Sequence, residues 1–304
     1  MSNKILVTAR TFGTANPGAL KMLQDAGFSC TKVDADRSPE AFLEELQESV
    51  AIILGNNPLS GEAIRQGKNL KIIAKHGSGT GNIDLAMAKE MGIVVTNVPT
   101  VNTNTIADLT FAHIQAALSG IIRADGLARQ GRHFYGRELY GKTLGFIGFG
   151  AVAQAVASRA AGFNLTTIFH DPFSEAGEHS LEDIVSQSDI ISVHAPLTEL
   201  TENMISEDVL LAMKKDAVLV NLGRSGVIDE HALFKVMKQG HLFAAALQAQ
   251  TEEEGQTQLM ELPNVAFAPP ILNFATETIS AVSQTCAINV LRKLSGQDPD
   301  FIVS

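Results

Sequence analysis

The chain has 304 residues, of which 45% are hydrophobic and 18% are charged, and it carries a formal net charge of −10. This length fits two domains or one large one, and the apolar content is enough for sizeable buried cores. The acidic balance, without any run rich in Lys and Arg, argues against a nucleic-acid binder, which needs a positive surface to meet phosphates. No apolar run reaches the roughly 18 residues of a membrane span, and the N-terminus lacks the pattern of a signal peptide, so we expect a cytoplasmic protein.

The two cysteines, Cys30 and Cys286, fall outside any CxxC or Cys/His spacing. We interpret both as small buried hydrophobes rather than redox or metal residues. No group of His, Asp and Cys residues has the spacing of metal ligands, so no metal is expected.

Short β-branched runs alternate with amphipathic helical patterns from the start of the chain. The predicted strands of this first series are Lys4–Ala9, Ser29–Val33, Ala51–Leu54, Leu70–Ala74 and Ile93–Thr96. The predicted helices are Pro17–Ala26, Pro39–Glu48 and Asp84–Met91. Such alternation builds a parallel sheet covered by helices on both faces.

A second series of strands and helices follows a long helical pattern over Thr105–Arg129. The alternation restarts with a strand at Thr143–Ile147 and a helix at Ala151–Ala161, continues to about residue 270, and ends in a helix at about Glu277–Leu294. The sequence therefore predicts an α/β protein with two doubly wound parallel-sheet domains.

The segment Gly145-Phe-Ile-Gly148-Phe-Gly150-Ala-Val-Ala153 combines a strand, a G-x-G-x-x-A turn and the start of a helix. Gly148 permits the tight turn, and Gly150 lets the backbone approach a pyrophosphate without a Cβ in the way. Ala153 is small enough for close packing of the helix on the strand. The N-terminus of that helix offers free N–H groups and a positive dipole end to phosphates.

Asp171 ends the next predicted strand, about 20 residues after the glycine turn, as in dinucleotide-binding folds. A carboxylate there accepts hydrogen bonds from both hydroxyls of the adenine ribose and repels a 2′-phosphate. No Arg or Lys flanks Asp171, so the sequence favours NAD over NADP.

Four further segments carry a family resemblance. They are His194-Ala-Pro-Leu-Thr198 followed by Thr201, Asn221-Leu-Gly-Arg224-Ser-Gly-Val-Ile-Asp229-Glu230, Gly77-Ser-Gly-Thr-Gly-Asn-Ile-Asp84 and Gly92-Ile-Val-Val-Thr-Asn-Val-Pro99. They resemble motifs of the D-2-hydroxyacid dehydrogenases and follow one another along the chain in that family's order, and the resemblance is closest to the phosphoglycerate dehydrogenase-like branch. The resemblance runs over nearly the whole chain.

The resemblance implies a flavodoxin-like substrate domain, residues 1–99 plus 272–304, and an inserted Rossmann NAD-binding domain, residues 100–271. It also implies a substrate cleft between the domains and a homodimer held largely through the coenzyme domains. The expected partner is a small-molecule 2-hydroxy or 2-keto acid.

The site residues carried over from the family fall into three groups. Arg224 binds the substrate carboxylate and carbonyl oxygens, for which its planar fork is well suited, and Glu253 is the carboxylate of the catalytic pair. Ser78 and Gly79 match the backbone N–H groups that bind the substrate carboxylate. The positions expected to contact NAD are Gly148, Gly150, Ala151, Val152, Asp171, His194, Ala195, Pro196, Thr201, Leu222, Gly223, Arg224 and Gln248.

The chain departs from the family pattern at three places. Pro270 stands where the family has its catalytic His, and proline carries no proton. Gln248 replaces the Asp that holds the nicotinamide carboxamide, and a Gln can still accept that amide proton. Asn56-Asn57 replaces the Arg-Ser of true phosphoglycerate dehydrogenases, which argues against 3-phosphoglycerate as the substrate.

Loss of a general acid typically lowers a rate by about 10² to 10⁴, so three alternatives stay open. Another group supplies the proton, with His76 beside the glycine loop and His113 on the long helix as candidates. A second alternative is a non-catalytic NAD-binding regulatory or interaction protein. The third is different NAD-linked chemistry, such as oxidation of formate or phosphite, because a fold does not fix its substrate.

Overall fold

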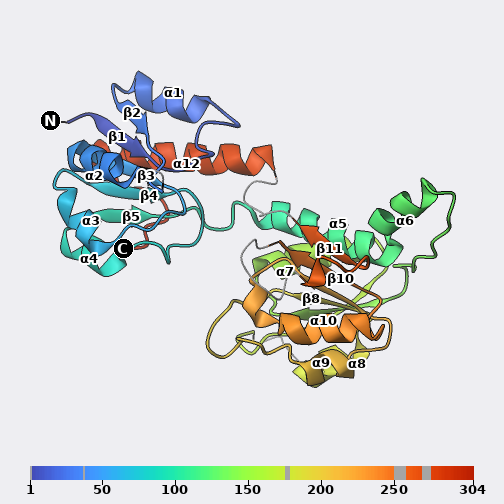
Figure 1. Cartoon of the computed structure of the whole chain (residues 1–304). Coiled ribbons are helices and arrows are strands. Elements are labelled where there is room, and N and C mark those ends of the chain that lie inside the picture. The colour runs from blue at the N-terminus through green and yellow to red at the C-terminus, as the bar shows by residue number, and fades with distance from the viewer. Residues whose placement is uncertain (1, 37, 175–178, 250–257, 269–274) are drawn as a thin grey trace. The chain divides into compact units, whose positions relative to one another are not determined.

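The computed structural model describes residues 2–36, 38–174, 179–249, 258–268 and 275–304. The chain divides into two compact units, Met1–Asn102 with Leu272–Ser304, and Thr103–Ile271 (Figure 1). The second unit thus starts at residue 103, whereas the sequence predicts its start at residue 100.

The first unit is built on a five-stranded parallel sheet with the order β2-β1-β3-β4-β5. Its strands are β1 (Lys4–Val7), β2 (Ser29–Lys32), β3 (Ser49–Leu54), β4 (Ile72–Lys75) and β5 (Val94–Thr96). This is the flavodoxin-like strand order, which reverses between β1 and β3. The predicted fold class of this unit is confirmed.

Helices cover both faces of this sheet. They are α1 (Gly18–Asp25), α2 (Pro39–Glu48), α3 (Gly61–Gln66), α4 (Leu85–Glu90) and α12 (Thr276–Leu294). Alternate residues of each strand pack on opposite faces of the sheet and form two cores. Ile53 lies in the core formed with α1 and α12, and Ile52 lies in the core on the opposite face. Helix α3 is not among the predicted helices, although its N-cap Ser60 accepts a hydrogen bond from the N–H of Ala63.

The second unit holds a six-stranded parallel sheet with the order β11-β10-β9-β8-β6-β7. Its strands are β6 (Thr143–Ile147), β7 (Thr166–His170), β8 (Ile190–Val193), β9 (Val218–Asn221), β10 (Ala244–Gln248) and β11 (Val265–Ala268). The strand order reverses between β6 and β8, as a Rossmann-type sheet requires.

The helices of the second unit also pack on both faces of its sheet. They are α5 (Thr103–Ser119), α6 (Ile121–Ala128), α7 (Ala151–Ala161), α8 (Leu181–Gln187), α9 (Glu207–Ala212) and α10 (Glu230–Lys238), with a short 3-10 turn at Ser225–Val227. On β6, Phe146 faces the core under α5 and α7, and Ile147 faces the opposite core. The predicted doubly wound architecture is therefore confirmed for both units.

The prediction of a single long helix over Thr105–Arg129 is wrong, because the structure has two helices there, α5 and α6, separated at Gly120. Gly120 has φ +61°, a left-handed conformation that suits glycine. A Cβ at Gly120 would also lie 2.1 Å from the Phe134 ring, so the segment after α6 folds back over the break. A helical pattern does not reveal such a stop, since the apolar spacing continues through it.

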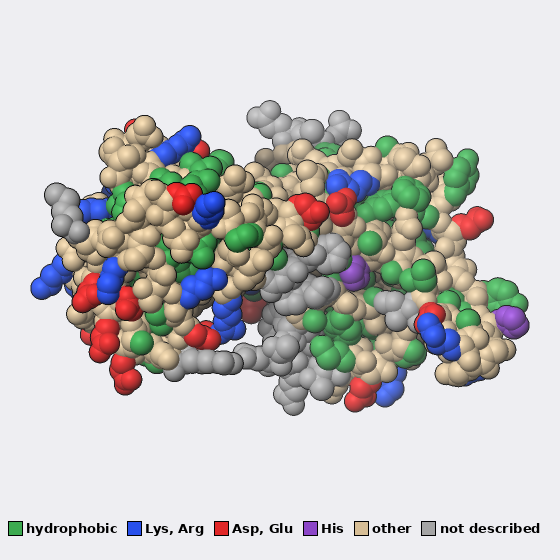
Figure 2. Space-filling model, turned by 90° about the horizontal axis from the view of Figure 1, so that it is seen from above, with side chains coloured by type: hydrophobic (Ala, Val, Ile, Leu, Met, Phe, Trp, Pro, Cys, Tyr) green, Lys and Arg blue, Asp and Glu red, His purple; other side chains and the backbone are tan. Residues whose placement is uncertain are grey.

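Charged side chains of both signs are interspersed over the surface that Figure 2 presents. They do not gather there into the basic patch that a nucleic-acid binder requires. Among the helices that the structure describes, none is long and apolar enough to cross a membrane.

Candidate functional site

The candidate cofactor site lies in the second unit, at the carboxyl ends of its parallel strands. Ligands of open α/β sheets bind where the strand order reverses, which here is between β6 and β8. The glycine turn follows β6, and the His194 segment follows β8. The N–H of His194 donates to the carbonyl of Ile147 at 2.7 Å, which joins the two strand ends.

Gly148 forms the sharp turn at the end of β6. Its φ of +85° is in the left-handed region, where an L side chain is strained. A Cβ at this position would lie 2.8 Å from the backbone N of Ala195. Both conformation and space therefore require glycine, and the turn lies directly against the segment after β8.

Gly150 precedes α7 and leaves space for a bound group. A Cβ built on Gly150 meets no atom within 4 Å, and no side chain caps the N-terminus of α7. The first N–H groups of a helix lack partners within the helix, and its N-terminus favours anions. The residues at this turn, including Ala151 and Val152, thus fit the pyrophosphate of a dinucleotide.

Asp171 is fixed by the glycine turn rather than standing free beyond β7. Its carboxylate accepts the N–H of Phe149 at 2.8 Å and the N–H of Phe173 at 2.9 Å. The Phe149 ring stacks on Phe169 of β7, with 4.0 Å between ring centroids. These contacts hold a half-buried carboxylate beside the turn, the place where it can accept the hydroxyls of a ribose.

The segment from His194 to Thr201 forms a closed turn. The hydroxyl of Thr201 donates to the carbonyl of Pro196 at 2.5 Å and accepts the N–H of Thr198 at 2.8 Å. Thr201 therefore shapes the turn that carries Ala195 and Pro196. His194 shares a hydrogen bond of 2.9 Å with the hydroxyl of Ser192, and burial lowers the pKa of His194 to about 4, so the ring is neutral near pH 7.

Two side-chain amides hold the loop that follows β9 and carries Arg224. Asn221 donates to the carbonyl of Arg224 at 2.9 Å and accepts the N–H of Gly223 at 3.0 Å. Gln248, at the end of β10, donates to the carbonyl of Leu222 at 2.7 Å when its amide nitrogen faces that carbonyl. An ionised Asp at position 248 would have no N–H to donate to that carbonyl. The hydrogen bond that holds this loop therefore depends on the Gln of this chain.

The guanidinium of Arg224 is exposed at the carboxyl end of β9. Within the part of the chain that the structure describes, it has no hydrogen-bond or ion-pair partner. Several other arginines of this unit are engaged, as in the ion pair of Arg159 with Asp108. A planar guanidinium without a partner, on a loop held by hydrogen bonds, is suited to bidentate binding of a carboxylate.

In the first unit, Ser78 and Gly79 form an exposed turn after β4. The side chain of Asn97 donates to the carbonyl of Ser78 at 2.7 Å and holds this turn. Neither the N–H of Ser78 nor that of Gly79 donates to another described residue. A Cβ at Gly79 meets no atom within 4 Å, so these N–H groups are available to an anion.

The two histidines considered as substitute acids are both engaged. His76 is buried and shares a hydrogen bond of 3.0 Å with the hydroxyl of Ser283 on α12. Burial lowers the pKa of His76 to about 4, so it is neutral near pH 7. On α5, the Nδ1 of His113 bonds to the carbonyl of Leu109 at 2.9 Å, one helical turn back. His76 therefore carries no proton to donate as an imidazolium at that pH.

Sequence reasoning missed Lys75, a buried lysine that ends β4 three residues before Ser78. The signal was present in the sequence, because a lysine closes the otherwise apolar run Ile72-Ile-Ala-Lys75 before a glycine loop. Two other positions cannot be placed, since Glu253 and Pro270 lie outside the described residues. Among those described, no group of three or more His, Cys, Asp and Glu side chains could hold a metal ion.

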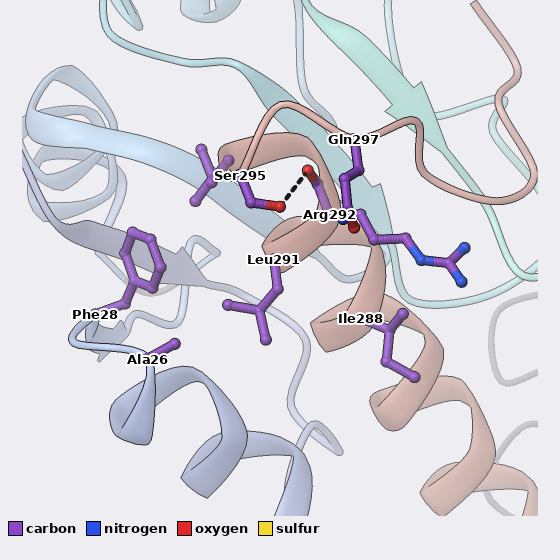
Figure 3. Close-up of a pocket in the computed structure, with 8 residues that line it drawn as sticks. Ala26, Phe28, Ile288, Leu291, Arg292, Ser295 and Gln297 are labelled. Carbon is purple, nitrogen blue, oxygen red and sulfur yellow. Dashed lines mark hydrogen bonds between the residues drawn. The ribbon is translucent and has the colours of Figure 1, made fainter.

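A surface pocket of about 430 Å³ lies elsewhere in the first unit, between the C-terminal ends of α1 and α12 (Figure 3). Its lining is mostly apolar, with Phe28, Ile288 and Leu291 among the residues that line it. The guanidinium of Arg292 is paired with Asp300 at 2.5 Å. The pocket offers no convergent reactive groups, so the candidate site stays at the strand ends.

Comparison with known proteins places the chain in a family. Residues 111–271 match the model of the D-isomer specific 2-hydroxyacid dehydrogenase NAD binding domain. A glyoxylate reductase of Korarchaeum cryptofilum is 34% identical over 90% of this chain and 88% of its own. A D-3-phosphoglycerate dehydrogenase of Methanocaldococcus jannaschii is 32% identical over 99% of this chain, which spans 59% of that relative.

The crystal structure of the TT0316 protein from Thermus thermophilus is also similar, with a TM-score of 0.89 and 30% identity. It covers 99% of this chain and 100% of its own. The glycine turn, the fixed carboxylate of Asp171 and the matched NAD-binding domain agree on the cofactor, which is NAD. The chain belongs to the D-isomer specific 2-hydroxyacid dehydrogenases.

Proposed function

We propose that the protein is an NAD-dependent oxidoreductase that reduces a small 2-keto acid to the 2-hydroxy acid, or catalyses the reverse oxidation. The observation that carries this proposal is Arg224, an exposed guanidinium without a partner among the described residues, on a loop held by Asn221 and Gln248. Relatives named glyoxylate reductase support a small keto acid as the substrate class.

Bound NADH supplies the hydride that the carbonyl carbon of the keto acid accepts. Arg224 binds a carboxylate oxygen and the carbonyl oxygen, and its charge stabilises the negative charge that develops there. The N–H groups of Ser78 and Gly79 bind the remaining carboxylate oxygen. Asp171 holds the adenine ribose, and the N–H groups at the start of α7 meet the pyrophosphate.

The proton for the new hydroxyl has no histidine source in this proposal. Pro270 occupies the family position of the acid, and His76 and His194 are neutral near pH 7. We therefore propose that the proton comes from solvent, which makes the enzyme slow by the factor of about 10² to 10⁴ that a general acid typically supplies. Glu253 is proposed to act at the reacting end of the substrate, as its family position implies.

The experiment is a fluorescence titration of NADH followed by absorbance measurement of NADH loss with a panel of 2-keto acids. Glyoxylate reduction is expected, and Arg224→Ala is expected to lower kcat/KM by at least about 100-fold, the scale of a lost charged contact in the transition state. Arg65→Ala is the control, because Arg65 is an exposed arginine on α3 of the first unit.

A second candidate function is favoured by Pro270 itself, namely an NAD-binding regulatory or interaction protein without turnover. Tight NADH binding combined with no loss of NADH over the whole panel would support this candidate against the first. Activity gained in Pro270→His would identify the missing acid as the cause.

A further inference from the structure

His76 is a buried polar side chain to which the proposed function gives no role. It directly follows β4 and precedes the exposed turn of Ser78 and Gly79. Its ring meets the ring of Phe12 edge to face, with 6.1 Å between the centroids, and Phe12 belongs to the apolar core formed with α1 and α12. An imidazole in such a core costs free energy unless its nitrogens are hydrogen-bonded. The partner of this ring therefore indicates its role.

The hydroxyl of Ser283 on α12 is the partner of the His76 ring. The ring Nε2 and the hydroxyl oxygen are 3.0 Å apart and share a hydrogen bond, and both side chains are buried. The N–H of Gly13, in the loop between β1 and α1, donates to the same hydroxyl at 3.4 Å. Ser283 thus joins the residue that follows β4 to α12 and to the loop that follows β1.

The loop of residues 77–79, which we call the carboxylate loop, starts directly after His76. The N–H of Val98 and the side chain of Asn97 donate to the carbonyls of its first two residues, at 2.9 Å and 2.7 Å. These two contacts hold the loop from the segment after β5. The His76 ring, anchored on α12, holds the other side, at the point where the loop leaves β4.

We infer that His76 is a positioning residue for the substrate, because its hydrogen bond to Ser283 holds the carboxylate loop in the shape in which the N–H groups of Ser78 and Gly79 bind the carboxylate of the keto acid. This inference rests on the proposed function, which assigns the carboxylate to these two N–H groups. The role requires no proton transfer. It agrees with a ring that is neutral near pH 7, since burial lowers the pKa of His76 to about 4.

The test measures KM and kcat for the best keto acid of the panel at saturating NADH. His76→Phe keeps an aromatic ring in the core and removes the hydrogen bond to Ser283. KM is expected to rise about tenfold, the scale of one neutral hydrogen bond. We expect kcat to change by less than about twofold, because the carboxylate is bound alike in the ground state and the transition state. Loss of folded protein would instead lower kcat and leave KM unchanged.

Two further variants examine the hydrogen bond itself. His76→Gln places an amide near the position of the ring Nε2 and is expected to keep KM within about threefold of the wild-type value. Ser283→Ala removes the other half of the bond and is expected to raise KM as His76→Phe does. The double variant should raise KM no further, because the two changes remove the same interaction.

Ser280→Ala is the matched control. Ser280 lies about one turn earlier on α12, and its hydroxyl accepts the side-chain N–H of Asn16 at 2.9 Å. This variant loses a similar hydrogen bond of the same helix but none to the residue before the carboxylate loop, so its KM is expected to stay unchanged. An unchanged KM in His76→Phe would overturn the inference. An equal rise of KM in Ser280→Ala would also overturn it, because any loosening of α12 would then have the same effect.

If no keto acid of the panel is reduced, the proposed function fails, and calorimetry of oxamate with NADH present decides the inference alone. Oxamate is a stable analogue of a small keto acid, with a carboxylate next to a carbonyl. Binding that is about tenfold weaker in His76→Phe and unchanged in Ser280→Ala supports the inference. Equal binding by wild-type protein and His76→Phe, or no binding by wild-type protein, contradicts it.

Discussion

Arg224 follows β9 and Lys75 ends β4, and these two cations differ in environment. Arg224 is exposed, and the amides of Asn221 and Gln248 fix its loop. Lys75 is buried beside Gly55 and Asn56. A guanidinium stays charged at any relevant pH, whereas a buried ammonium does not, so the two residues predict different pH dependence.

Burial lowers the pKa of Lys75 to about 8. The groups that face it do not titrate nearby, since burial raises the pKa of Cys286 to about 12 and lowers that of His76 to about 4. Lys75 therefore loses its charge above pH 8 in the free enzyme.

The glycine turn after β6 is an element that the sequence predicts well, because local conformation determines it. Gly148, Gly150 and Asp171 each lie where the pattern of strand, turn and helix indicates. The break at Gly120 was not predicted, since the apolar spacing continues through it, and the contact with Phe134 is made by the segment that follows α6. The same applies to Lys75, whose burial follows from the packing of three strand ends rather than from its neighbours in sequence.

Gly148→Ala is expected to destabilise the second unit and weaken NADH binding. The left-handed conformation alone costs about 1–2 kcal/mol for an L residue, and the clash of a Cβ with the backbone of Ala195 adds to this cost. Gly240→Ala is the control, because Gly240 has φ +71° but open space around it. Urea unfolding and NADH titration of the two variants separate strain from the clash.

The difference in stability and NADH affinity between Gly148→Ala and Gly240→Ala shows whether the close approach of the turn matters. Gly148→Ala should lose more stability than Gly240→Ala and should also lose NADH affinity. Equal stability and equal NADH affinity in the two variants would show that the close approach of the turn to the segment after β8 has no role.

For the whole molecule, the two series of strands and helices predict two parallel sheets, and both are present. The assignment of α12 to the first unit came from the family resemblance, since no periodicity tells where a last helix returns. In the structure, α12 packs on α1 and β4. The roles of Glu253 and Pro270 stay predictions, because their positions are outside the described residues.

We predict that the protein is a homodimer formed through the second unit. Figure 1 shows α6 standing out from the body of this unit. Large apolar side chains on α6 and in the segment after it are exposed, as expected of a surface that a partner covers. The exposed fraction is 60% for Ile121 and 88% for Tyr135. Light scattering should give twice the chain mass. Ile121→Glu is expected to lower this mass, whereas Leu211→Glu on α9 should leave it unchanged, and a wild-type monomer would refute the prediction.

The most direct test of the central claim is a hydride-transfer measurement with NADH that carries deuterium at both C4 positions. Incubated with glyoxylate and the protein, and analysed by mass spectrometry, it detects even slow turnover. The account predicts a 2-hydroxy acid with one deuterium on C2, formed by wild-type protein and at least about 100-fold more slowly by Arg224→Ala. NADH that binds tightly while no deuterated product forms from glyoxylate or any other 2-keto acid would contradict the account and leave an NAD-binding protein without this chemistry.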